Sequence, residues 1–420
     1  MQLGIDRFFS DRAFRTPAQG RRVALLAHPA SMSYFGGSIG GAWMHSMDAL
    51  LKFAKDSGEF KVTAAFGPQH GMRGEKQDNM QETADYVDPE WGVPVFSLYG
   101  EVRRPTLAML ETFDVILVDL QDVGTRIYTF LTTLLYVLEA ASQAGKTVIV
   151  LDRPNPAGRP VEGSLLDKGW VSFVGAAEGL PMRHGLTLGE AALWFKARLK
   201  INVDLHVVPM AGYDPDCAPG YGWPEGELSW VNPSPNAATL SMARAFPGTV
   251  LIEGCNLSEG RGTTRPLETL GGPQLDMTRI LNRMHALAPE WMQGCLLRPT
   301  WFLPTFQKHA GVIIPGFQIH VDSKHYNHQA FKPYRLVSLW LKAIRLEVPD
   351  YSIWRDFHYE YEQSRLAIDL INGGPCLREW VDDRGAVPAD FDNRLRRDEA
   401  AWLSDSREFW LYGSPKQLIR

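Results

Sequence analysis

The 420-residue sequence lacks the features that mark several large classes of protein. Its four cysteines, Cys217, Cys255, Cys295 and Cys376, form no CxxC pair. A disulfide framework or a zinc knuckle is therefore not expected, and free thiols in a reducing cytoplasm are the simplest interpretation. No apolar run approaches the roughly 20 residues that span a bilayer. The first residues also lack the charged start and apolar stretch of a secretory signal.

Long stretches of one charge are missing as well. The formal net charge is -5, and no run of Lys or Arg is longer than a pair. Because nucleic-acid-binding proteins normally present a basic face, we expect neither a nucleic acid nor a membrane as a partner. Hydrophobic residues make up 45% of the chain and charged residues 22%, which is typical of a globular protein. The length exceeds what one core usually organises, so two domains are expected.

The first half of the chain alternates short apolar runs with helical patterns. The candidate strands are Arg22–His28, Lys61–Gly67, Val93–Leu98, Val115–Leu120, Thr147–Leu151 and Val203–Val208, and the candidate helices are Ala42–Ser57, Thr106–Glu111, Tyr128–Ala144 and Leu188–Leu199. The runs at 115–120 and 147–151 are continuously apolar, as in central parallel strands that are covered on both faces. This alternation predicts an α/β fold, with a Rossmann-like, mainly parallel sheet domain over residues 1–240.

The composition of the sequence changes near Trp223–Ala238, where prolines, glycines and asparagines predict a long irregular connecting segment. Beyond it the pattern predicts strands at Thr249–Glu253 and Val312–Val321, and helices at Asp276–Leu287 and Tyr334–Leu346. We therefore expect a smaller α+β domain over residues 241–420, with the active-site cleft between the two domains.

Polar side chains follow most of the predicted parallel strands. In open α/β sheets, ligands bind beyond the carboxyl ends of the strands. Any one of these segments fits an ordinary turn or helix cap, but five on one edge of a sheet predict a binding site. The candidate site residues among them are Gln69, His70, Arg73, Glu75, Asp122, Arg126, Tyr128, Arg153 and Asn155.

Asp122 fits two roles, the N-cap of a helix over 126–144 and a carboxylate at the mouth of the cleft. Arg126 lies near the start of that helix, where the helix dipole disfavours a cation, so it is expected to serve Asp122 or a substrate carboxylate. His184 precedes a predicted capping box that ends at Glu190, and we expect it at the same mouth. Glu190 itself is expected to be structural.

The second domain holds one dense polar stretch, Glu253–Pro266. Its glycines indicate a tight loop, and it lacks the Gly-Lys-Ser/Thr ending of a Walker loop. We expect this loop to face the strand ends of the first domain. The candidates here are Asn256, Glu259 and Arg261, joined by Gln318 and His320, which share one face of a predicted strand.

Taken in order, eight segments resemble the exo-β-N-acetylmuramidase family of the NamZ type. They are Phe66–Gly74, Ser97–Gly100, Asp119–Thr129, Leu151–Pro156, Arg183–Glu190, Val231–Asn236, Asn256–Thr264 and Gly316–Val321. The resemblance implies a Rossmann-like domain plus a smaller C-terminal domain, with the site between them. It also implies release of N-acetylmuramic acid from the non-reducing end of peptidoglycan fragments. The partner is then a small carbohydrate or a muropeptide, and no cofactor or metal is expected.

At one position the sequence departs from that family. Many members are expected to carry Glu before the His-Gly pair, where this chain has Gln69. A glutamine cannot donate a proton and take it back. The catalytic carboxylate is then a different one, or the protein does related chemistry, or it binds sugar without turnover.

Glycoside cleavage usually needs two carboxyl groups, and the candidates are Glu75, Asp122 and Glu259. Our hypothesis makes Glu259 or Glu75 the proton donor, its pKa raised by burial, and Asp122 the base or an electrostatic stabiliser. His70 and His184 would share the proton transfer. Arg73, Arg126 and Arg261 would hold the lactyl carboxylate of muramic acid. The other candidates for substrate binding are Gln69, Tyr128, Arg153, Asn155, His184, Asn256, Gln318 and His320.

Two other classes of function stay open at this point. Asp119, Asp122, Asp152 and His184 offer the ligands of an oxygen-rich metal site for phosphoryl or amide hydrolysis, although no tight ligand motif supports it. A non-catalytic module that binds muropeptide or sugar is the third interpretation, and Gln69 favours it.

Overall fold

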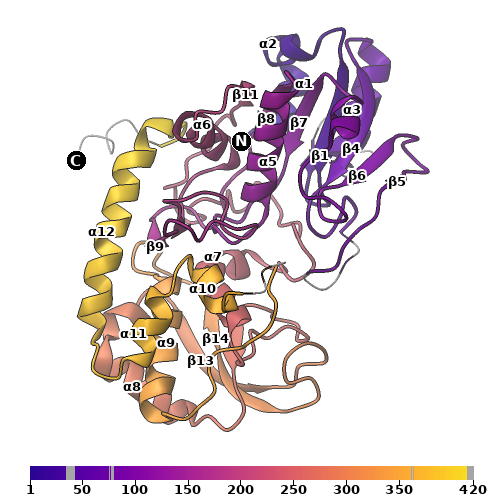
Figure 1. Ribbon diagram of the computed structural model, residues 1–420. Coiled ribbons are helices and arrows are strands. Elements are labelled where there is room, and N and C mark those ends of the chain that lie inside the picture. Colours follow the sequence, from indigo (N-terminus) through magenta and orange to yellow (C-terminus); the bar gives the residue numbers. More distant parts are fainter. Residues whose placement is uncertain (35–42, 75, 77–79, 361, 363, 414–420) are drawn as a thin grey trace.

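The computed structural model describes residues 1–34, 43–74, 76, 80–360, 362 and 364–413 (Figure 1). Its main sheet has seven strands in the order β11-β8-β7-β1-β4-β6-β5. The strands are β1 (Arg22–Ala27), β4 (Lys61–Gly67), β5 (Tyr86–Val87), β6 (Pro94–Ser97), β7 (Val115–Asp119), β8 (Thr147–Leu151) and β11 (Asp204–Val208). The neighbours from β11 to β6 pair in parallel, and β5 pairs antiparallel at the edge. The predicted Rossmann-like sheet and its six parallel strands are confirmed.

Successive side chains of a central strand point to opposite faces of the sheet. Both faces are buried, which explains why the central strands are apolar throughout. Val115 and Leu117 of β7 belong to one buried core, whereas Ile116 and Val118 belong to another on the opposite face. Helices α1 (Gly4–Ser10) and α3 (Ser46–Ser57) cover the first face, and α4 (Leu107–Leu110), α5 (Phe130–Gln143) and α6 (Leu188–Arg198) cover the second. Smaller elements are α2 (Arg12–Arg15), η1 (Thr16–Ala18), β2 (Met32–Ser33) and β3 (Met44–His45).

The chain builds the sheet outward from β1, first through β4 and β6 and then, on the other side, through β7, β8 and β11. The strand order therefore reverses between β1 and β7, which is where Rossmann-like sheets bind ligands. Here this place is filled by buried protein groups. Arg153 pairs with Asp119 at 2.6 Å, and the His28 ring accepts a hydrogen bond from the backbone N–H of Gln121 at 2.7 Å.

The C-terminal part is smaller and contains a three-stranded antiparallel sheet in the order β12-β14-β13. Its strands are β12 (Thr269–Gly271), β13 (Leu296–Phe302) and β14 (Ile314–His320). Its helices are α7 (Leu240–Thr249), η3 (Val250–Gly254), α8 (Met277–Leu287), η4 (Pro289–Met292), α9 (Pro333–Glu347), α10 (Ala367–Asn372) and α11 (Cys376–Asp382). The predicted mixture of α and β structure is confirmed.

The predicted strand at Thr249–Glu253 is wrong, because this segment is the end of α7 followed by the 3-10 helix η3. Every residue of the run is buried, and a short buried aliphatic run has the same pattern in a strand and in a helix. Close packing against the rest of the protein determines that this run forms a helix and not a strand. A Cβ on Gly248 would lie 2.0 Å from the carbonyl oxygen of Pro333, so α7 and α9 touch backbone to backbone.

Helix α12 (Pro388–Ser406) returns from the C-terminal part and runs along one side of the molecule to α6 (Figure 1). The Trp402 indole donates a hydrogen bond to the carbonyl oxygen of His184 at 2.8 Å, and the Trp194 indole donates one to Asp405 at 2.7 Å. The short helix η5 (Arg407–Phe409) follows. The division of the chain near residue 240 stays a prediction, and α12 packs against the first part.

A hairpin of β9 (Glu162–Leu165) and β10 (Pro181–Arg183) joins the two parts more closely. The Glu162 carboxylate accepts hydrogen bonds from the backbone N–H groups of Tyr334 and Arg335, at the start of α9, at 3.2 and 2.9 Å. All three residues are buried. The two parts therefore meet through buried polar contacts.

Candidate functional site

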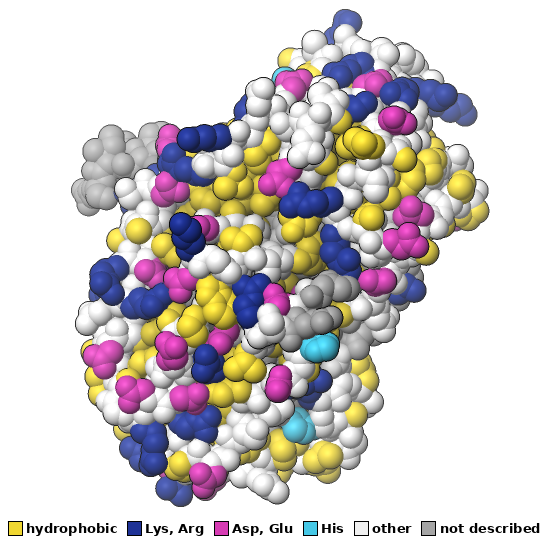
Figure 2. Space-filling view, viewed as in Figure 1, with side chains coloured by type: hydrophobic (Ala, Val, Ile, Leu, Met, Phe, Trp, Pro, Cys, Tyr) yellow, Lys and Arg dark blue, Asp and Glu magenta, His cyan; other side chains and the backbone are white. Residues whose placement is uncertain are grey.

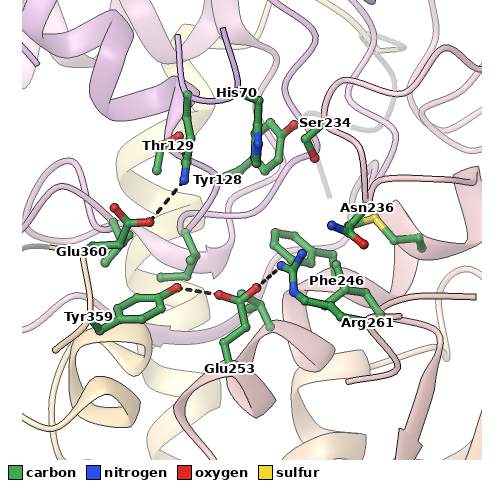
Figure 3. Close-up of a pocket in the computed structure, with 16 residues that line it drawn as sticks. His70, Tyr128, Thr129, Ser234, Asn236, Phe246, Glu253, Arg261, Tyr359 and Glu360 are labelled. Atoms are coloured by element: carbon green, nitrogen blue, oxygen red, sulfur yellow. Dashed lines mark hydrogen bonds and ion pairs between the residues drawn. The ribbon is translucent and has the colours of Figure 1, made fainter. Parts of the chain in front are cut away.

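A pocket lies where loops of the first part face loops of the C-terminal part (Figure 3). The residues after β4 and at the start of α5 form one side of it, and residues of η3 and the loop before α10 form the other. Its polar lining consists of Gln69, His70, Tyr128, Thr129, Ser234, Asn236, Glu253, Arg261, Tyr359 and Glu360. The apolar lining is Ile127, Val174, Met242, Phe246, Val250 and Leu267.

A chain of hydrogen bonds crosses this pocket from α5 to the loop before α10. Thr129 is the N-cap residue of α5 but makes no side-chain cap, and its hydroxyl donates instead to Oε1 of Gln69 at 2.7 Å. This fixes the amide orientation, so that Nε2 of Gln69 donates to Oε1 of Glu360 at 3.2 Å. The Tyr99 hydroxyl donates to Oε2 of Glu360 at 2.8 Å. Among the described residues, the hydrogen-bond donors to the Glu360 carboxyl are thus neutral groups.

The second carboxyl of the pocket, Glu253, has a charged partner. Nη2 of Arg261 lies 2.7 Å from Oε1 of Glu253, and the Tyr359 hydroxyl donates to Oε2 at 2.7 Å (Figure 3). Burial and the neighbouring carboxylates raise the pKa of Tyr359 well above its ordinary value, so this hydroxyl keeps its proton. Arg261 also lies 3.2 Å from Glu259.

These two glutamates have opposite environments. Burial, and after it the nearby Glu253 carboxylate, raise the pKa of Glu360 to about 7, although the hydrogen bonds from Tyr99 and Gln69 and the charge of Arg103 act to lower it. Glu253 has the guanidinium of Arg261 beside it. A pair of titratable groups in such unlike surroundings is the usual mark of an acid and an ionised partner.

Three residues of the pocket lining have left-handed backbone conformations, which cost non-glycine residues about 1–2 kcal/mol each. They are His70 (φ 71°), Leu267 (φ 61°) and Glu360 (φ 45°). The ring of His70 is tied to the carbonyl oxygen of Lys76 at 2.9 Å. Such strain persists only where the surrounding structure enforces it, and it is frequent at functional sites.

The structure brings four of the predicted site residues into this pocket. Gln69, His70 and Tyr128 come from the strand-end segments of the first part, and Arg261 comes from the glycine-containing loop of the second. The two polar segments predicted to face each other thus share one pocket. The roles proposed for these four residues stay predictions.

Two of the predicted carboxylates, Asp122 and Glu259, do not line this pocket. Oδ2 of Asp122 accepts a hydrogen bond from the backbone N–H of Gly124 at 2.7 Å, so it caps a turn and not the helix, which begins at Phe130. The raised pKa predicted for Glu259 is wrong, because burial alone would raise it but the charges of Lys308 and Arg261 outweigh burial and lower it. Lys308 lies 2.7 Å from Glu259, which disfavours a proton donor there. Glu75 lies outside the described residues.

Arg126 contacts backbone carbonyl oxygens and not Asp122, one of the two anionic partners expected from its position. It is fully buried, and its guanidinium donates to the carbonyl oxygens of Ser164 and Leu180 in the first part and of Ile371 and Asn372 in the second. The helix it was expected to begin starts four residues later. Arg126 therefore joins the two parts of the chain.

The remaining candidates also have protein partners outside the pocket. Arg73 pairs with Asp88 at 2.7 Å, and Arg153 pairs with Asp119. The Asn155 amide donates to the carbonyl oxygen of Leu186 at 3.0 Å. Polar contacts within the protein also occupy His184 with Asp122, Asn256 with Ser352 and Trp354, Gln318 with Arg298, and His320 with Asp322.

The residues of the alternative metal site do not form a ligand cluster. Asp119 is held by Arg153, and Asp152 accepts hydrogen bonds from Thr187 at 2.7 Å and Tyr412 at 2.6 Å. Within the described part of the chain, no group of three or more His, Cys, Asp or Glu side chains is placed to hold a metal ion. The predicted capping box of Thr187 and Glu190 is confirmed.

Glu253 and Glu360 are the carboxyl-bearing residues of the described pocket lining, and the sequence singled out neither as a candidate. Glu253 opens the polar stretch that predicted the second loop, but only later residues of that stretch were chosen. Ser234 and Asn236 belong to a segment that carried the family resemblance. Glu360 has no motif around it, and it meets Gln69 across 291 positions of sequence.

The face of the molecule shown in Figure 2 is mixed in charge. On the face shown in Figure 2, Lys and Arg side chains are interspersed with Asp and Glu, and among the described residues of that face neither sign forms a continuous patch. Of the helices described between residues 1 and 413, none is long and apolar enough to cross a membrane.

Comparisons with known proteins match the whole architecture. Residues 23–241 match the family model described as exo-β-N-acetylmuramidase NamZ, N-terminal, and residues 244–412 match the corresponding C-terminal model. The chain is 37% identical over 325 residues to the peptidoglycan β-N-acetylmuramidase NamZ of Bacillus subtilis (strain 168). The aligned region covers 77% of this chain and 73% of that protein.

Two solved structures share the fold. A DUF1343 family protein from Bacteroides fragilis is similar with a TM-score of 0.81 and 26% identity over 98% of both chains. A second DUF1343 family protein from the same organism is similar with a TM-score of 0.72 and 24% identity, over 98% of this chain and 99% of that one. The arrangement of the two parts is therefore that of known structures.

Proposed function

The chain belongs to the exo-β-N-acetylmuramidase NamZ family, and we propose that it is a glycosidase that releases N-acetylmuramic acid from the non-reducing end of peptidoglycan fragments. One observation carries the proposal. The pocket between the two parts holds two buried carboxyls, Glu253 and Glu360, in opposite electrostatic environments. Glycoside cleavage with an oxocarbenium-like transition state uses such a pair.

The rest of the lining suits a sugar ring. Tyr128, Ser234 and Asn236 place polar groups along the wall, and Phe246 supplies an aromatic surface (Figure 3). Sites for small polar ligands combine an apolar wall with a few convergent polar groups, which fix the orientation of the ligand. A small carbohydrate or a muropeptide is accordingly the substrate that we propose.

A cytoplasmic location is part of the same proposal. All four cysteines lie in the described part of the chain and are free thiols, and Cys255 is buried. Free thiols are typical of proteins in reducing compartments. In the cytoplasm, the substrates available to the enzyme would be peptidoglycan fragments that are small enough to be taken up.

A pair of chromogenic substrates tests the function. The 4-nitrophenyl β-glycosides of N-acetylmuramic acid and of N-acetylglucosamine differ in the lactyl ether at one ring position. We expect the purified protein to hydrolyse the first and to leave the second, and to remove single terminal residues from a muropeptide oligomer. Failure to release sugar from any of these substrates contradicts the proposal.

Two further measurements separate the alternatives. Calorimetry that shows N-acetylmuramic acid binding without turnover would support a non-catalytic binding module, which the glutamine at position 69 favours. Loss of hydrolysis in a strong chelator would support a metal-dependent hydrolase. We expect the rate to be unchanged by the chelator.

A further inference from the structure

The pocket presents a specific chemical problem at Gln69. Its amide lies inside the pocket, 8% exposed, where the two sides of the site meet, but an amide cannot give up a proton and recover it. Glu360 lies within hydrogen-bond distance of that amide and is also 8% exposed. A carboxyl therefore lies directly beside Gln69, supplied from the other half of the chain.

We propose that Glu360 is the general acid of the reaction, and that Gln69 is a positioning residue which holds the Glu360 carboxyl through its own contact with Thr129. This rests on the proposed glycosidase function. Among the described residues that line the pocket, Glu253 and Glu360 are the two with carboxyl groups. Glu253 is paired with Arg261, whereas the hydrogen-bond donors to Glu360 among the described residues are the neutral Gln69 and Tyr99.

The geometry of Glu360 leaves it able to react. From the described residues, each carboxyl oxygen accepts one hydrogen bond. A carboxyl oxygen has two lone pairs, so each can also carry the proton that is donated to the substrate. Its backbone has a left-handed φ of 45°, which directs the side chain from a strained loop into the pocket. The charged and titratable groups that act on it are Glu253, Arg103, Tyr99 and Tyr359.

The step balances as a simple hydrolysis. Glu360 transfers its carboxyl proton to the glycosidic oxygen while the bond from that oxygen to C1 breaks, and the leaving sugar departs as a neutral alcohol with the bonding electrons. The Glu253 carboxylate stabilises the positive charge that develops at C1 and the ring oxygen. A water molecule supplies the hydroxyl group to C1, and the proton that it releases replaces the one given up by Glu360.

Exchanging the two side chains across their hydrogen bond gives the sharpest test. We expect Glu360→Gln to lower kcat by about 10²–10⁴ on a natural muropeptide, the usual contribution of a general acid. The loss should be much smaller on a 2,4-dinitrophenyl glycoside, whose leaving group needs no proton. The double variant Gln69→Glu/Glu360→Gln returns a carboxyl to the same hydrogen-bonded pair, and it should recover part of the lost rate.

The positioning role of Gln69 has its own readout. The hydrogen bond from Gln69 favours the ionised form of Glu360, so Gln69→Leu should move the alkaline limb of the kcat profile to higher pH. Glu190→Gln is the matched control, because Glu190 is a buried carboxyl outside the pocket whose pKa burial also raises to about 7. That variant should leave the limb where it is in the wild type.

Each outcome decides one claim. If the wild type hydrolyses the N-acetylmuramide but Glu360→Gln keeps the full rate and the same alkaline limb, the assignment of Glu360 is wrong while the proposed function stands. If the wild type hydrolyses none of the substrates, the proposed function fails first. Circular dichroism and thermal unfolding of each variant identify any loss of rate that comes from misfolding.

Discussion

The guanidinium of Arg261 lies 2.7 Å from the buried carboxylate of Glu253, on the side of the pocket formed by η3. Arg261 is also 3.2 Å from Glu259, so one cation forms ion pairs with two buried carboxylates. Removing one partner of a buried ion pair leaves charge without compensation, which typically costs about 3–5 kcal/mol.

We therefore expect Arg261→Met to lower the free energy of unfolding by about 3–5 kcal/mol, measured by urea denaturation. Arg396→Met is the control, because its pair with Asp392 lies on the surface of α12 and should contribute about 0.5 kcal/mol or less. Equal losses of unfolding free energy in the two variants would show that the ion pairs of Arg261 contribute no more to stability than a surface pair does.

Tyr359→Phe tests the second contact of Glu253. The hydroxyl donates to Oε2 of Glu253, and a hydrogen bond to a charged group contributes about 1.5–3 kcal/mol. If that carboxylate stabilises the transition state, kcat should fall about tenfold or more while the fold is kept. Tyr351→Phe, whose hydroxyl contacts Pro273 outside the pocket, should keep the wild-type kcat. An unchanged kcat in Tyr359→Phe would remove Glu253 from the mechanism.

The raised pKa of Glu360 predicts how stability changes with pH. Its folded pKa of about 7 exceeds the ordinary value of 4.5, so between these values the folded chain holds a proton that the unfolded chain has lost. The stabilisation is complete below about pH 4.5 and disappears as the pH rises through 7, a change of about 3 kcal/mol. Urea denaturation at pH 5 and pH 8 should show this loss in the wild type and a smaller one in Glu360→Gln. Identical pH slopes in the two proteins would contradict the prediction.

Arg126→Met separates a structural arginine from a substrate-binding one. Four carbonyl oxygens lose their buried donor, so we expect a decrease of several kcal/mol in the free energy of unfolding. The KM of the remaining folded protein for the chromogenic N-acetylmuramide should stay within about twofold of the wild type, because Arg126 does not line the pocket. A large rise in KM with unchanged stability would restore the role in carboxylate binding that the sequence suggested.

Much of the first part was predictable because its pattern is local. Strands 61–67 and 147–151 match their predicted limits, because β8 is buried throughout and β4 is buried except at Lys61 and Thr63, and most of their positions are apolar. The 249–253 run was misread for the same reason that the strands were found. Full burial removes the periodicity, and contact with distant residues such as Pro333 determines the backbone conformation.

The site was predictable in place but not in detail. The segments containing His70 and Arg261 do meet, as the strand ends and the glycine-containing loop indicated. Most of the other polar candidates instead satisfy one another or the backbone, as Arg153 does with Asp119. A sequence shows that a side chain is polar but not whether a protein partner occupies it. Glu360 could not be found, because its contact with Gln69 depends on the folded arrangement of segments 291 positions apart.

The contacts that Arg126, Glu162 and α12 make between the two parts determine whether the chain can be produced as two separate fragments. A fragment ending near residue 240 would leave a buried guanidinium with two of its four acceptors missing, and the complementary fragment would expose the carbonyls of Ile371 and Asn372. Neither fragment is then self-sufficient, so a gene cut at this point should yield insoluble products unless both halves are made together. Because buried contacts join the two parts, we expect the intact protein to unfold in one calorimetric transition.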